Sequence, residues 1–282
     1  MSTSNKYTNI LYQNIGIAGC GEMGYPMLKK LLQNNVQATG HDIKSENNFV
    51  EFGDNFISSK SDFFNKNDVF LSIVRDKRET DELLVNNDVL KSKKNATILI
   101  CSTLSTNYIS ELKNKLPAQF NLLDTPMSGS TIKAEQGTLT FMVGGDKNNV
   151  NYIMPLLNIL GKNILHIGEY GSGMSAKLLN NFVAASSVLA TRNVLSQIHN
   201  FGLTKKQLLD VITCSTGDNW FAQNYEELNW SKENFLKTNT MGILEKDLLS
   251  YLESKSRIEK NTTIDNYENS IVEGIKNIPK IP

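Results

Sequence analysis

The sequence predicts an α/β fold class: an N-terminal doubly wound domain, then an all-helical domain, joined through a long interdomain helix. Short apolar runs alternate with helical periodicity through the first half of the chain. A glycine-rich turn at 19–24 stands between the first apolar run and the first helical pattern. The segment 172–200 has no proline and one glycine, and few strand signals follow it. Strand and helix alternating at this spacing are typical of a mostly parallel sheet covered by helices.

The individual elements follow from apolar runs bounded by turn residues and from helical periodicity. Strands are predicted at 15–18, 36–41, 69–74, 97–101, 122–124 and 141–143. Helices are predicted at 23–32, 172–200, 205–212, 241–253 and 264–276. The helix at 172–200 would be on the order of 40 Å long. The change of character near 168–173 predicts a nucleotide-binding domain at 1–168 and a helical substrate or dimerisation domain at 169–282.

Composition narrows the function classes. The 282 residues carry 29 basic and 29 acidic side chains, so the formal net charge is zero. A nucleic-acid-binding protein usually shows a basic excess or stripe, and no nucleic-acid partner is expected. The three cysteines, Cys20, Cys101 and Cys214, are far apart and fit neither a disulfide framework nor a metal site, which favours a cytoplasmic location and no metal.

Targeting signals are not expected either. The segment 1–9 is polar, without an apolar signal core or an Arg-rich amphipathic pattern, and is predicted to be a frayed tail. No apolar run approaches the length of a membrane span, so no membrane partner is predicted.

The motif at 19–24, Gly-Cys-Gly-Glu-Met-Gly, predicts a dinucleotide-binding turn of Rossmann type. Gly19 permits the tight turn, Gly21 lets the backbone approach the pyrophosphate, and Gly24 lets the helix pack close to the sheet. Glu22 and Met23 open the helix, whose N-terminus faces the phosphates. The alternative is a glycine-rich turn without a ligand; the preceding strand, the following helix and a downstream acidic residue favour the cofactor site.

That acidic residue is Asp42, at the end of the second predicted strand. A carboxylate there accepts hydrogen bonds from the adenine-ribose hydroxyls and repels a 2′-phosphate. Ile43 cannot hold a phosphate, although Lys44 and His41 are near enough to offset this in part. The pattern favours NAD over NADP; the alternative is a solvated turn residue at the strand end.

Three later motifs carry the candidate chemistry. Residues 124–130 (Asp-Thr-Pro-Met-Ser-Gly-Ser), with the glycine-containing segment 137–145, can form a carboxylate cradle from Ser128 and the amide of Gly129, or only a turn. In 171–181, Lys177 and Asn181 are one helical turn apart and share a face at the predicted domain junction.

The third motif is the pair Lys246 and Asp247 within 245–248. Taken alone, a lysine on a helix is usually a solvated charge, and an adjacent Lys-Asp pair is usually an ordinary surface pair. Only the combination of these motifs behind a dinucleotide-binding turn favours a catalytic role.

The order of these motifs resembles the β-hydroxyacid dehydrogenase family of the 6-phosphogluconate dehydrogenase superfamily. That family includes 3-hydroxyisobutyrate dehydrogenases, tartronate semialdehyde reductases and glyoxylate/succinic semialdehyde reductases. The resemblance runs from residue 15 to residue 249. Segments 138–145 and 215–220 look especially like 3-hydroxyisobutyrate dehydrogenases. Asn180 stands where the phosphogluconate branch has a histidine, which argues against a phosphogluconate decarboxylase.

The resemblance implies a role for each matching residue. Ser128 and the Gly129 amide would anchor the substrate carboxylate, Lys177 would be the general acid/base, and Asn181 would position the substrate beside it. Trp220 and Tyr225 match positions that reach the active site in the 3-hydroxyisobutyrate and serine dehydrogenase branch, or they are a helix-packing aromatic pair. The implied cofactor contacts beyond the glycine turn come from Val74, Arg75, Ser102, Thr103, Lys246 and Asp247, the last orienting Lys246.

Two departures from the family pattern stand out. Ser130 occupies a position that is often a second glycine, and the chain after Leu249 lacks the recognisable final Gly- and Asp-containing segment. The resemblance implies an NAD-dependent oxidoreductase that interconverts a small β-hydroxyacid and its semialdehyde, as a homodimer or homotetramer. The alternatives are a reductase for another small carbonyl or imine (tartronate or succinic semialdehyde, glyoxylate) and a non-catalytic dinucleotide-binding scaffold. The retention of Lys177 argues against an imine reductase, and its retention together with the cradle argues against the scaffold.

Overall fold

The computed structural model describes residues 10–255 and 262–281. The predicted tail at 1–9 lies outside the described residues. The chain divides into two compact units, Met1–Lys177 and Leu178–Pro282, which are called the N-terminal unit and the helical unit.

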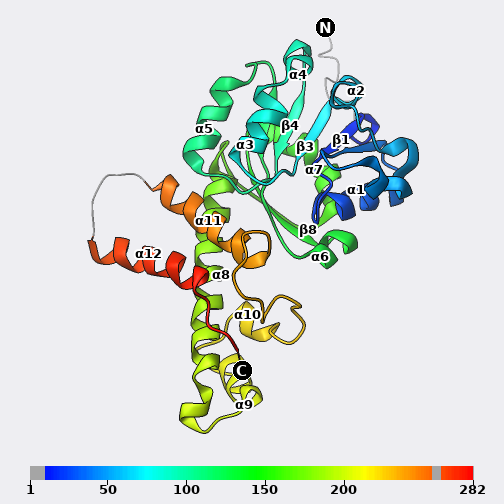
Figure 1. Cartoon of the computed structure of the whole chain (residues 1–282). Helices are drawn as coiled ribbons and strands as arrows, with labels where there is room; N and C mark the ends of the chain where they lie inside the picture. The colour runs from blue at the N-terminus through cyan, green and yellow to red at the C-terminus, as the bar shows by residue number, and fades with distance from the viewer. Residues whose placement is uncertain (1–9, 256–261, 282) are drawn as a thin grey trace. The chain divides into compact units, whose positions relative to one another are not determined.

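The N-terminal unit is built on a twisted sheet with strand order β2-β1-β3-β4-β5-β7-β6, and β8 pairs with β7 (Figure 1). Strands β1 to β5 are parallel, whereas β7 runs antiparallel to β5 and β6. The strands are β1 Ile15–Ala18, β2 Ala38–His41, β3 Val69–Ser72, β4 Thr97–Ile100, β5 Asn121–Asp124, β6 Met127–Ser128, β7 Leu139–Gly144 and β8 Gly161–Gly168. This topology places the carboxyl ends of β1 to β5 along one edge, where doubly wound sheets bind ligands.

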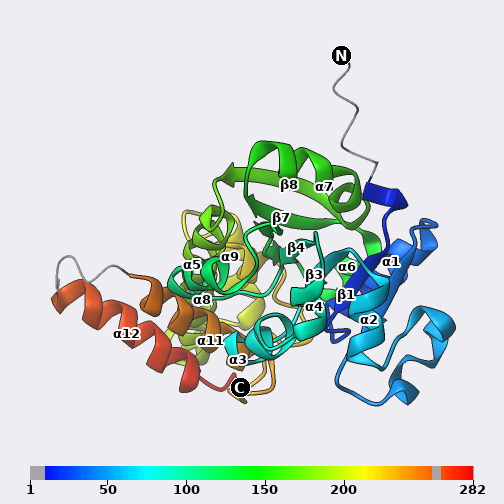
Figure 2. The same ribbon diagram turned by 90° about the horizontal axis from the view of Figure 1, so that it is seen from above.

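Helices cover both faces of this sheet (Figure 2). Ile15 and Ile17 of β1 pack into one core with Met27 and Leu28 of α1, while Gly16 between them faces Phe63 of α2. The first face carries α1 Gly24–Gln33, α6 Thr131–Gln136 and α7 Lys147–Leu160. The remaining helical elements of the unit are η1 Ile10–Tyr12, η2 Glu46–Asn55, α2 Lys60–Lys66, α3 Lys77–Thr80, η3 Asp81–Val85, α4 Asp88–Ser92 and α5 Thr106–Lys115.

The fold class predicted from the sequence is confirmed, but the predicted ranges contain neither helices α2 to α7 and α10 nor strands β6 and β8. Helix α7 contains Pro155, which cannot donate a backbone hydrogen bond, and its first turn is rich in asparagine. Asp146 compensates at the start, because its carboxylate accepts the N–H groups of Asn148 and Asn149. Most residues of β8 are exposed, so the strand lacks the alternating apolar pattern that marks a half-buried strand.

The helical unit is organised around α8 Ser172–Ser196, whose first turn and a half belongs to the N-terminal unit. It ends earlier than the predicted 200, since a 3-10 helix, η4 Ile198–Phe201, follows and Gly202 takes a left-handed conformation with φ of 67°. The other helices are α9 Lys205–Thr213, α10 Trp220–Gln223, α11 Thr240–Ser254 and α12 Thr262–Lys276. Ala185, Val188 and Leu195 of α8 form a core with residues of α11 and α12.

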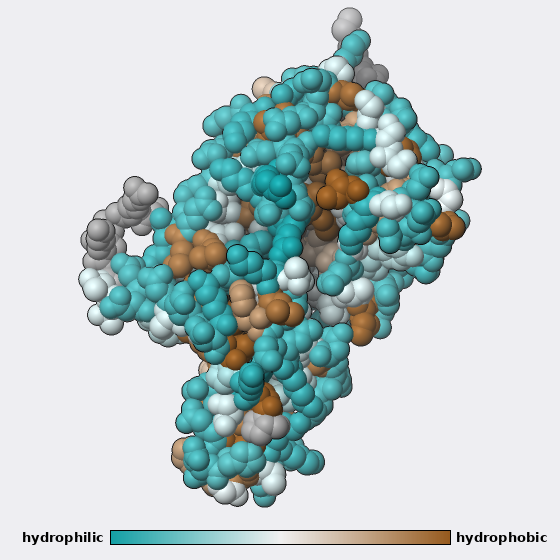
Figure 3. All heavy atoms as spheres, viewed as in Figure 1, coloured by the Kyte–Doolittle hydropathy of each residue, from teal (hydrophilic) through white to brown (hydrophobic). Residues whose placement is uncertain are grey.

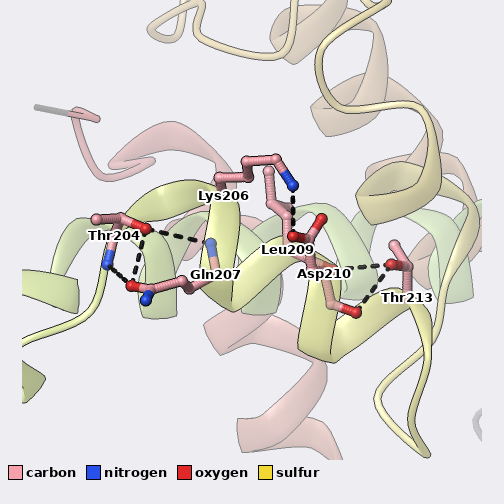
Figure 4. A network of polar contacts seen from close by, with 6 residues as sticks. All are labelled: Thr204, Lys206, Gln207, Leu209, Asp210 and Thr213. Carbon is pink, nitrogen blue, oxygen red and sulfur yellow. Dashed lines mark hydrogen bonds and ion pairs between the residues drawn. The ribbon is translucent and has the colours of Figure 1, made fainter.

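Helix α9 shows how local sequence sets a helix start. Thr204 accepts the backbone N–H of Gln207, and the Gln207 side chain accepts the backbone N–H of Thr204 (Figure 4). This reciprocal capping box satisfies two donors that a helix start otherwise leaves without partners. On the exposed face, Lys206 and Asp210 form an ion pair of 2.6 Å.

A buried arginine fixes the irregular part of the helical unit. Arg192 is fully buried on α8, and its guanidinium donates to the backbone carbonyls of Ser231, Glu233 and Pro279. A buried charge of this kind is tolerated when hydrogen bonds satisfy it.

Hydrophilic residues cover most of the face shown in Figure 3, and hydrophobic ones form small separate groups on it. In the described part of the chain, none of the helices combines the length and apolar character that crossing a bilayer requires.

Candidate active site

The glycine turn after β1 has the close contacts that its motif predicts. Gly19 has a φ of 96°, and a Cβ there would lie 2.4 Å from the carbonyl oxygen of Ile73. A Cβ on Gly24 would lie 1.9 Å from the carbonyl oxygen of Gly19. Both positions therefore exclude any side chain, because neighbouring backbone already fills the space.

Gly21 differs, because a Cβ there would meet nothing within 4 Å. Its backbone is thus open to a close approach by a ligand, and no side chain caps the start of α1 at Met23 among the described residues. Unpaired N–H groups at a helix start attract phosphate. These residues fit the pyrophosphate of a dinucleotide.

Two cavities compete as candidate cofactor sites in this unit. A pocket of about 290 Å³ adjoins the glycine turn and is lined by residues that include Gly21, Glu22 and Lys44. A larger cavity of about 550 Å³ lies at the opposite edge, beside Asp68 and Lys93, where the parallel strands begin. Because ligands of such sheets bind at the carboxyl ends of the strands, the smaller pocket is the better candidate.

Asp42 lies directly after β2, and Ile43 beside it is 92% exposed. The backbone N–H of Lys44 donates to Asp42 Oδ1 at 2.9 Å, which leaves Oδ2 for a ribose hydroxyl. His41 is buried, stacks on Phe63 and contacts the Ile57 carbonyl through Nδ1. The prediction that His41 could help to hold a phosphate is therefore wrong.

The loops after β3 and β4 are tied to each other. The Ser102 hydroxyl lies 2.6 Å from the carbonyl oxygen of Val74, to which it donates, and Ser102 is 6% exposed. Arg75 is exposed, and its backbone N–H donates to Glu79. Thr103 is half-buried at the same edge of the sheet. Ser102 thus holds the two strand ends together, whereas Arg75 and Thr103 remain accessible.

The cradle residues lie on the short strand β6 and in the turn that follows it. Ser128 pairs with Thr140 of β7, and its side chain is partly exposed. Gly129 has a φ of 142°, and a Cβ there would lie 2.8 Å from the Leu139 side chain. Only glycine fits this turn, which exposes backbone next to the Ser128 hydroxyl.

The first turn of α8 docks on the same strand, β7. A Cβ on Gly173 would lie 2.4 Å from the carbonyl oxygen of Met142, so the helix rests directly on the β7 backbone. Met142 is two residues along β7 from Thr140, the partner of Ser128, a separation of about 7 Å. The cradle and the helix that carries Lys177 are therefore held by neighbouring parts of one strand.

A carboxylate that the sequence analysis did not single out secures this helix start. Asp124 is fully buried at the end of β5 and accepts the N–H of Gly171 through Oδ1 and that of Met174 through Oδ2, each at 2.6 Å. Burial raises the pKa of the Asp124 carboxyl, and the two N–H groups oppose the rise. An aspartate five residues before Gly129 was the available signal, but nothing local indicated that its partners lie 47 and 50 residues away.

Lys177 and Asn181 lie one turn apart on α8 and are 8% and 9% exposed. In the helical unit, Asn181 Nδ2 donates to Asp247 Oδ2 at 2.6 Å, and Lys246 Nζ lies 2.8 Å from Asp247 Oδ1. Asp247 is buried, so one carboxylate holds both neighbours. The third motif thus meets the second through Asn181.

The structure does not bring Trp220 and Tyr225 to Asn181. Asn219, at the start of α10, bonds to Thr191, which lies about 15 Å along α8 from Asn181. Trp220 is 51% exposed, whereas Tyr225 is buried, with its ring edge-on to Phe221. Trp220 and Tyr225 thus lie apart from Asn181, and their contact with substrate stays a prediction.

Family models and curated relatives match most of this chain. The family model for the NAD binding domain of 6-phosphogluconate dehydrogenase matches residues 14–168. The model described as "NAD-binding of NADP-dependent 3-hydroxyisobutyrate dehydrogenase" matches residues 171–275. The mitochondrial 3-hydroxyisobutyrate dehydrogenase of Rattus norvegicus is 33% identical over 218 residues, which is 75% of this chain and 64% of the rat protein. The human enzyme is 30% identical over the same shares of both chains. The match thus spans less than two thirds of the length of these curated relatives.

Solved structures share the fold. The 3-hydroxyisobutyrate dehydrogenase of Mycobacterium tuberculosis, solved with L-serine, has a TM-score of 0.80 at 22% identity and 95% coverage of both chains. The one from Salmonella typhimurium has a TM-score of 0.77 at 21% identity, covering 94% of this chain and 99% of the other. With family models matching both halves, the chain belongs to the 3-hydroxyisobutyrate dehydrogenase-like branch of the β-hydroxyacid dehydrogenase family.

Proposed function

We propose that the protein is an NAD-dependent dehydrogenase that interconverts a small β-hydroxyacid and its semialdehyde, with Lys177 as the general acid/base. The observation that carries the proposal is the shared support of the site by β7. Ser128 pairs with Thr140 of this strand, and the α8 turn before Lys177 packs on Met142. A carboxylate anchor and a proton-transfer group are thereby held on one rigid element, as the positioning of a small hydroxyacid requires.

The roles of the residues follow from the two transfers in the reaction, of a hydride to NAD and of a proton to a base. When bound, NAD supplies the hydride acceptor. The Ser128 hydroxyl and the Gly129 amide would donate to the substrate carboxylate and fix its position. Neutral Lys177 would take the proton of the substrate hydroxyl as the hydride leaves the same carbon, which yields the semialdehyde and a protonated lysine. In the reverse direction the protonated Lys177 returns the proton.

Within the helical unit, Asn181 and Lys246 are the further candidates for contacts with substrate or cofactor. Asn181 Nδ2 donates to Asp247, and this bond fixes the orientation of the side-chain amide. Its Oδ1 is the acceptor, and it already accepts a hydrogen bond of 3.2 Å from Asn180 Nδ2. An amide oxygen in this orientation suits a substrate hydroxyl, which is a donor. Asp247 would keep Lys246 extended along the helix for contacts with cofactor or substrate.

The proposed cofactor is NAD, although one matching family model takes its name from an NADP-dependent enzyme. The support lies in the Asp42 carboxylate, with Oδ1 fixed by Lys44 N–H and Oδ2 open to a ribose hydroxyl. A 2′-phosphate would meet this negative charge, and the exposed Ile43 offers it no donor.

The names of the relatives suggest 3-hydroxyisobutyrate and L-serine as first substrates to test. Activity with NAD should be measured on these two acids, 3-hydroxypropionate, glycerate and 4-hydroxybutyrate. The wild type should oxidise at least one of the short acids, and Lys177→Ala should lose roughly 100-fold or more in kcat while still binding NADH. A Lys177→Ala variant with most of its kcat intact would refute the acid/base role, and a wild type inactive on the whole panel would refute the substrate class.

A further inference from the structure

The buried carboxylate of Asp124 joins the end of strand β5 to the first turn of α8. Its two oxygens accept the backbone N–H groups of Gly171 and Met174 at 2.6 Å each, and its exposure is 0%. The first N–H groups of a helix have no partner within the helix. A carboxylate that takes two of them from a distant strand fixes both the axial position and the rotation of the helix start.

Two further contacts act on the same turn. The backbone N–H of Leu104, in the loop after β4, points at Met174 Sδ at 3.3 Å. Gly173 packs on the β7 backbone without room for a side chain. The turn is therefore held from three strand ends at once, and Asp124 is the one charged group in these three contacts. Its counterpart is the positive N-terminal end of the α8 dipole.

Lys177 follows Met174 by three residues, so it lies on the next turn of the same helix. A helix is stiff over this distance, and any shift or rotation of its first turn is passed on to the lysine side chain. Asp124 also precedes Ser128 by four residues, on the segment that leads into the cradle. One side chain thus connects the strand that leads to the carboxylate anchor with the helix that carries the acid/base.

We infer that Asp124 is the positioning residue for Lys177, holding α8 so that the lysine amine stays aligned with the hydroxyl of a substrate anchored at Ser128. Asp124 is buried and does not contact substrate; it acts through the helix. The inference rests on the proposed role of Lys177. Misplacement of a reacting group by about 1 Å can cost a factor of 100 in rate.

The test compares the full-length wild type, Asp124→Asn, Lys177→Ala and the double variant, with NAD and the best hydroxyacid of the panel. Asparagine keeps the shape but can accept only through one atom, so one N–H of the turn loses its partner. We expect Asp124→Asn to lower kcat roughly 10- to 100-fold, with the NADH dissociation constant changed less than about twofold. In the Lys177→Ala background the same substitution should change the residual rate less than about twofold, because the group it positions is gone.

Asp146→Ala is the control for the loss of a helix cap. Asp146 also caps a helix of the N-terminal unit, since it accepts N–H groups of Asn148 and Asn149 at the start of α7. That substitution should lower the melting temperature by a few degrees, as loss of a cap does, and leave kcat within about twofold. If Asp124→Asn does not fold, Met174→Leu, which conserves volume but removes the sulfur acceptor of Leu104 N–H, should lower kcat severalfold in the same non-additive way.

The outcomes separate the inference from the proposed function. Wild-type kcat in folded Asp124→Asn, or full multiplicative losses in the double variant, overturns the positioning role while the role of Lys177 stands. Unchanged turnover in Lys177→Ala overturns the acid/base proposal, and the positioning role falls with it. A loss of kcat in Asp146→Ala equal to that in Asp124→Asn would show a general effect of domain stability and would also overturn the inference.

Discussion

The side-chain amide of Asn181 donates a 2.6 Å hydrogen bond to Oδ2 of Asp247, which links α8 to α11 inside the helical unit. The other oxygen of Asp247 lies 2.8 Å from Lys246 Nζ. Asp247→Asn keeps an acceptor for only one of these two neighbours. We expect kcat/KM for the hydroxyacid to fall roughly 10- to 100-fold, the equivalent of about 1.5–3 kcal/mol for a hydrogen bond to a charged group. Steady-state kinetics and an NADH-binding titration measure the effect.

Glu245→Gln is the control for that experiment, because this neighbouring carboxylate on α11 pairs with Lys276 of α12 at 3.6 Å. Its kcat/KM should stay within about twofold of the wild type. Equal kinetics for Asp247→Asn and Glu245→Gln would show that the link between Asn181 and Asp247 has no part in turnover.

Ser128→Ala should affect substrate binding and spare cofactor binding. The lost hydroxyl donates to the substrate carboxylate, so KM for the hydroxyacid should rise roughly tenfold or more, while KM for NAD stays within about twofold. Ser110→Ala serves as a control, since this exposed serine of α5 donates to the Thr106 carbonyl of its own helix. The wild type should also prefer 3-hydroxypropionate clearly to 1-propanol; equal activity on both would show that no carboxylate is recognised.

The cofactor preference should follow Asp42. Wild-type kcat/KM should be at least tenfold higher with NAD than with NADP, a difference of about 1.4 kcal/mol. Asp42→Ala removes the charge that repels a 2′-phosphate, so the ratio should fall toward unity, mainly through a lower KM for NADP. A wild type that prefers NADP tenfold would contradict the assignment of Asp42.

Thiol reactivity should separate the three cysteines. Burial together with the charge of Asp42 raises the pKa of Cys20 to about 12, and burial raises the pKa of Cys101 to about 12. Both groups therefore stay neutral thiols below that pH and react slowly, whereas Cys214 is exposed. Ellman's reagent at pH 8 should titrate one thiol per native chain and three after denaturation; Cys214→Ser should leave none in the native state. Rapid reaction of two native thiols would contradict the burial of Cys20 and Cys101.

Arg192→Met should destabilise the helical unit. Three backbone carbonyls lose their donor in a dry environment, which should cost about 3 kcal/mol or more. Both tryptophans of the chain, Trp220 and Trp230, lie in this unit, so urea unfolding followed by fluorescence excited at 295 nm reports on it selectively. Lys206→Ala, at the exposed pair of Figure 4, should leave the midpoint unchanged. A midpoint for Arg192→Met equal to that of Lys206→Ala would count against a stabilising role for Arg192.

Local signals were sufficient for strands β1 to β5 and β7 and for helices α1, α8, α9, α11 and α12. Strand β1, the glycine turn and α1 follow each other within twenty residues, and each is specified by its own apolar period or by a steric need for glycine. Helix α7 escaped prediction because Pro155 interrupts its pattern, and its stability comes from packing on the sheet. Strand β8 was not predicted because most of its residues are exposed, so its sequence lacks the alternation of apolar and polar residues that a buried face produces.

In the candidate site, too, contacts between residues close in sequence could be predicted and contacts between distant residues could not. Lys177 and Asn181 were paired correctly on one face of a helix, because four residues make one turn. The partners of Asp124 and of Asn181 are 47 to 66 residues distant, and no periodicity encodes contacts at that range. Tyr225 lies in the core of the helical unit with its ring packed against Phe221, as its helix-packing alternative predicts, and its substrate role stays a prediction.

The hydrogen bond from Lys44 N–H to Asp42 Oδ1 also bears on protein engineering. Exchanging Asp42 for a small or basic residue, the obvious route to an NADP-using variant, removes the acceptor that shapes the turn as well as the unwanted charge. A substitution of Asp42 therefore changes the cofactor specificity and the conformation of the turn at the same time. Asp42→Asn separates them, since the amide oxygen can still accept from Lys44 while the charge is gone. A redesign that begins from asparagine and adds a cation elsewhere in the pocket would alter the cofactor without first dismantling the turn that receives it.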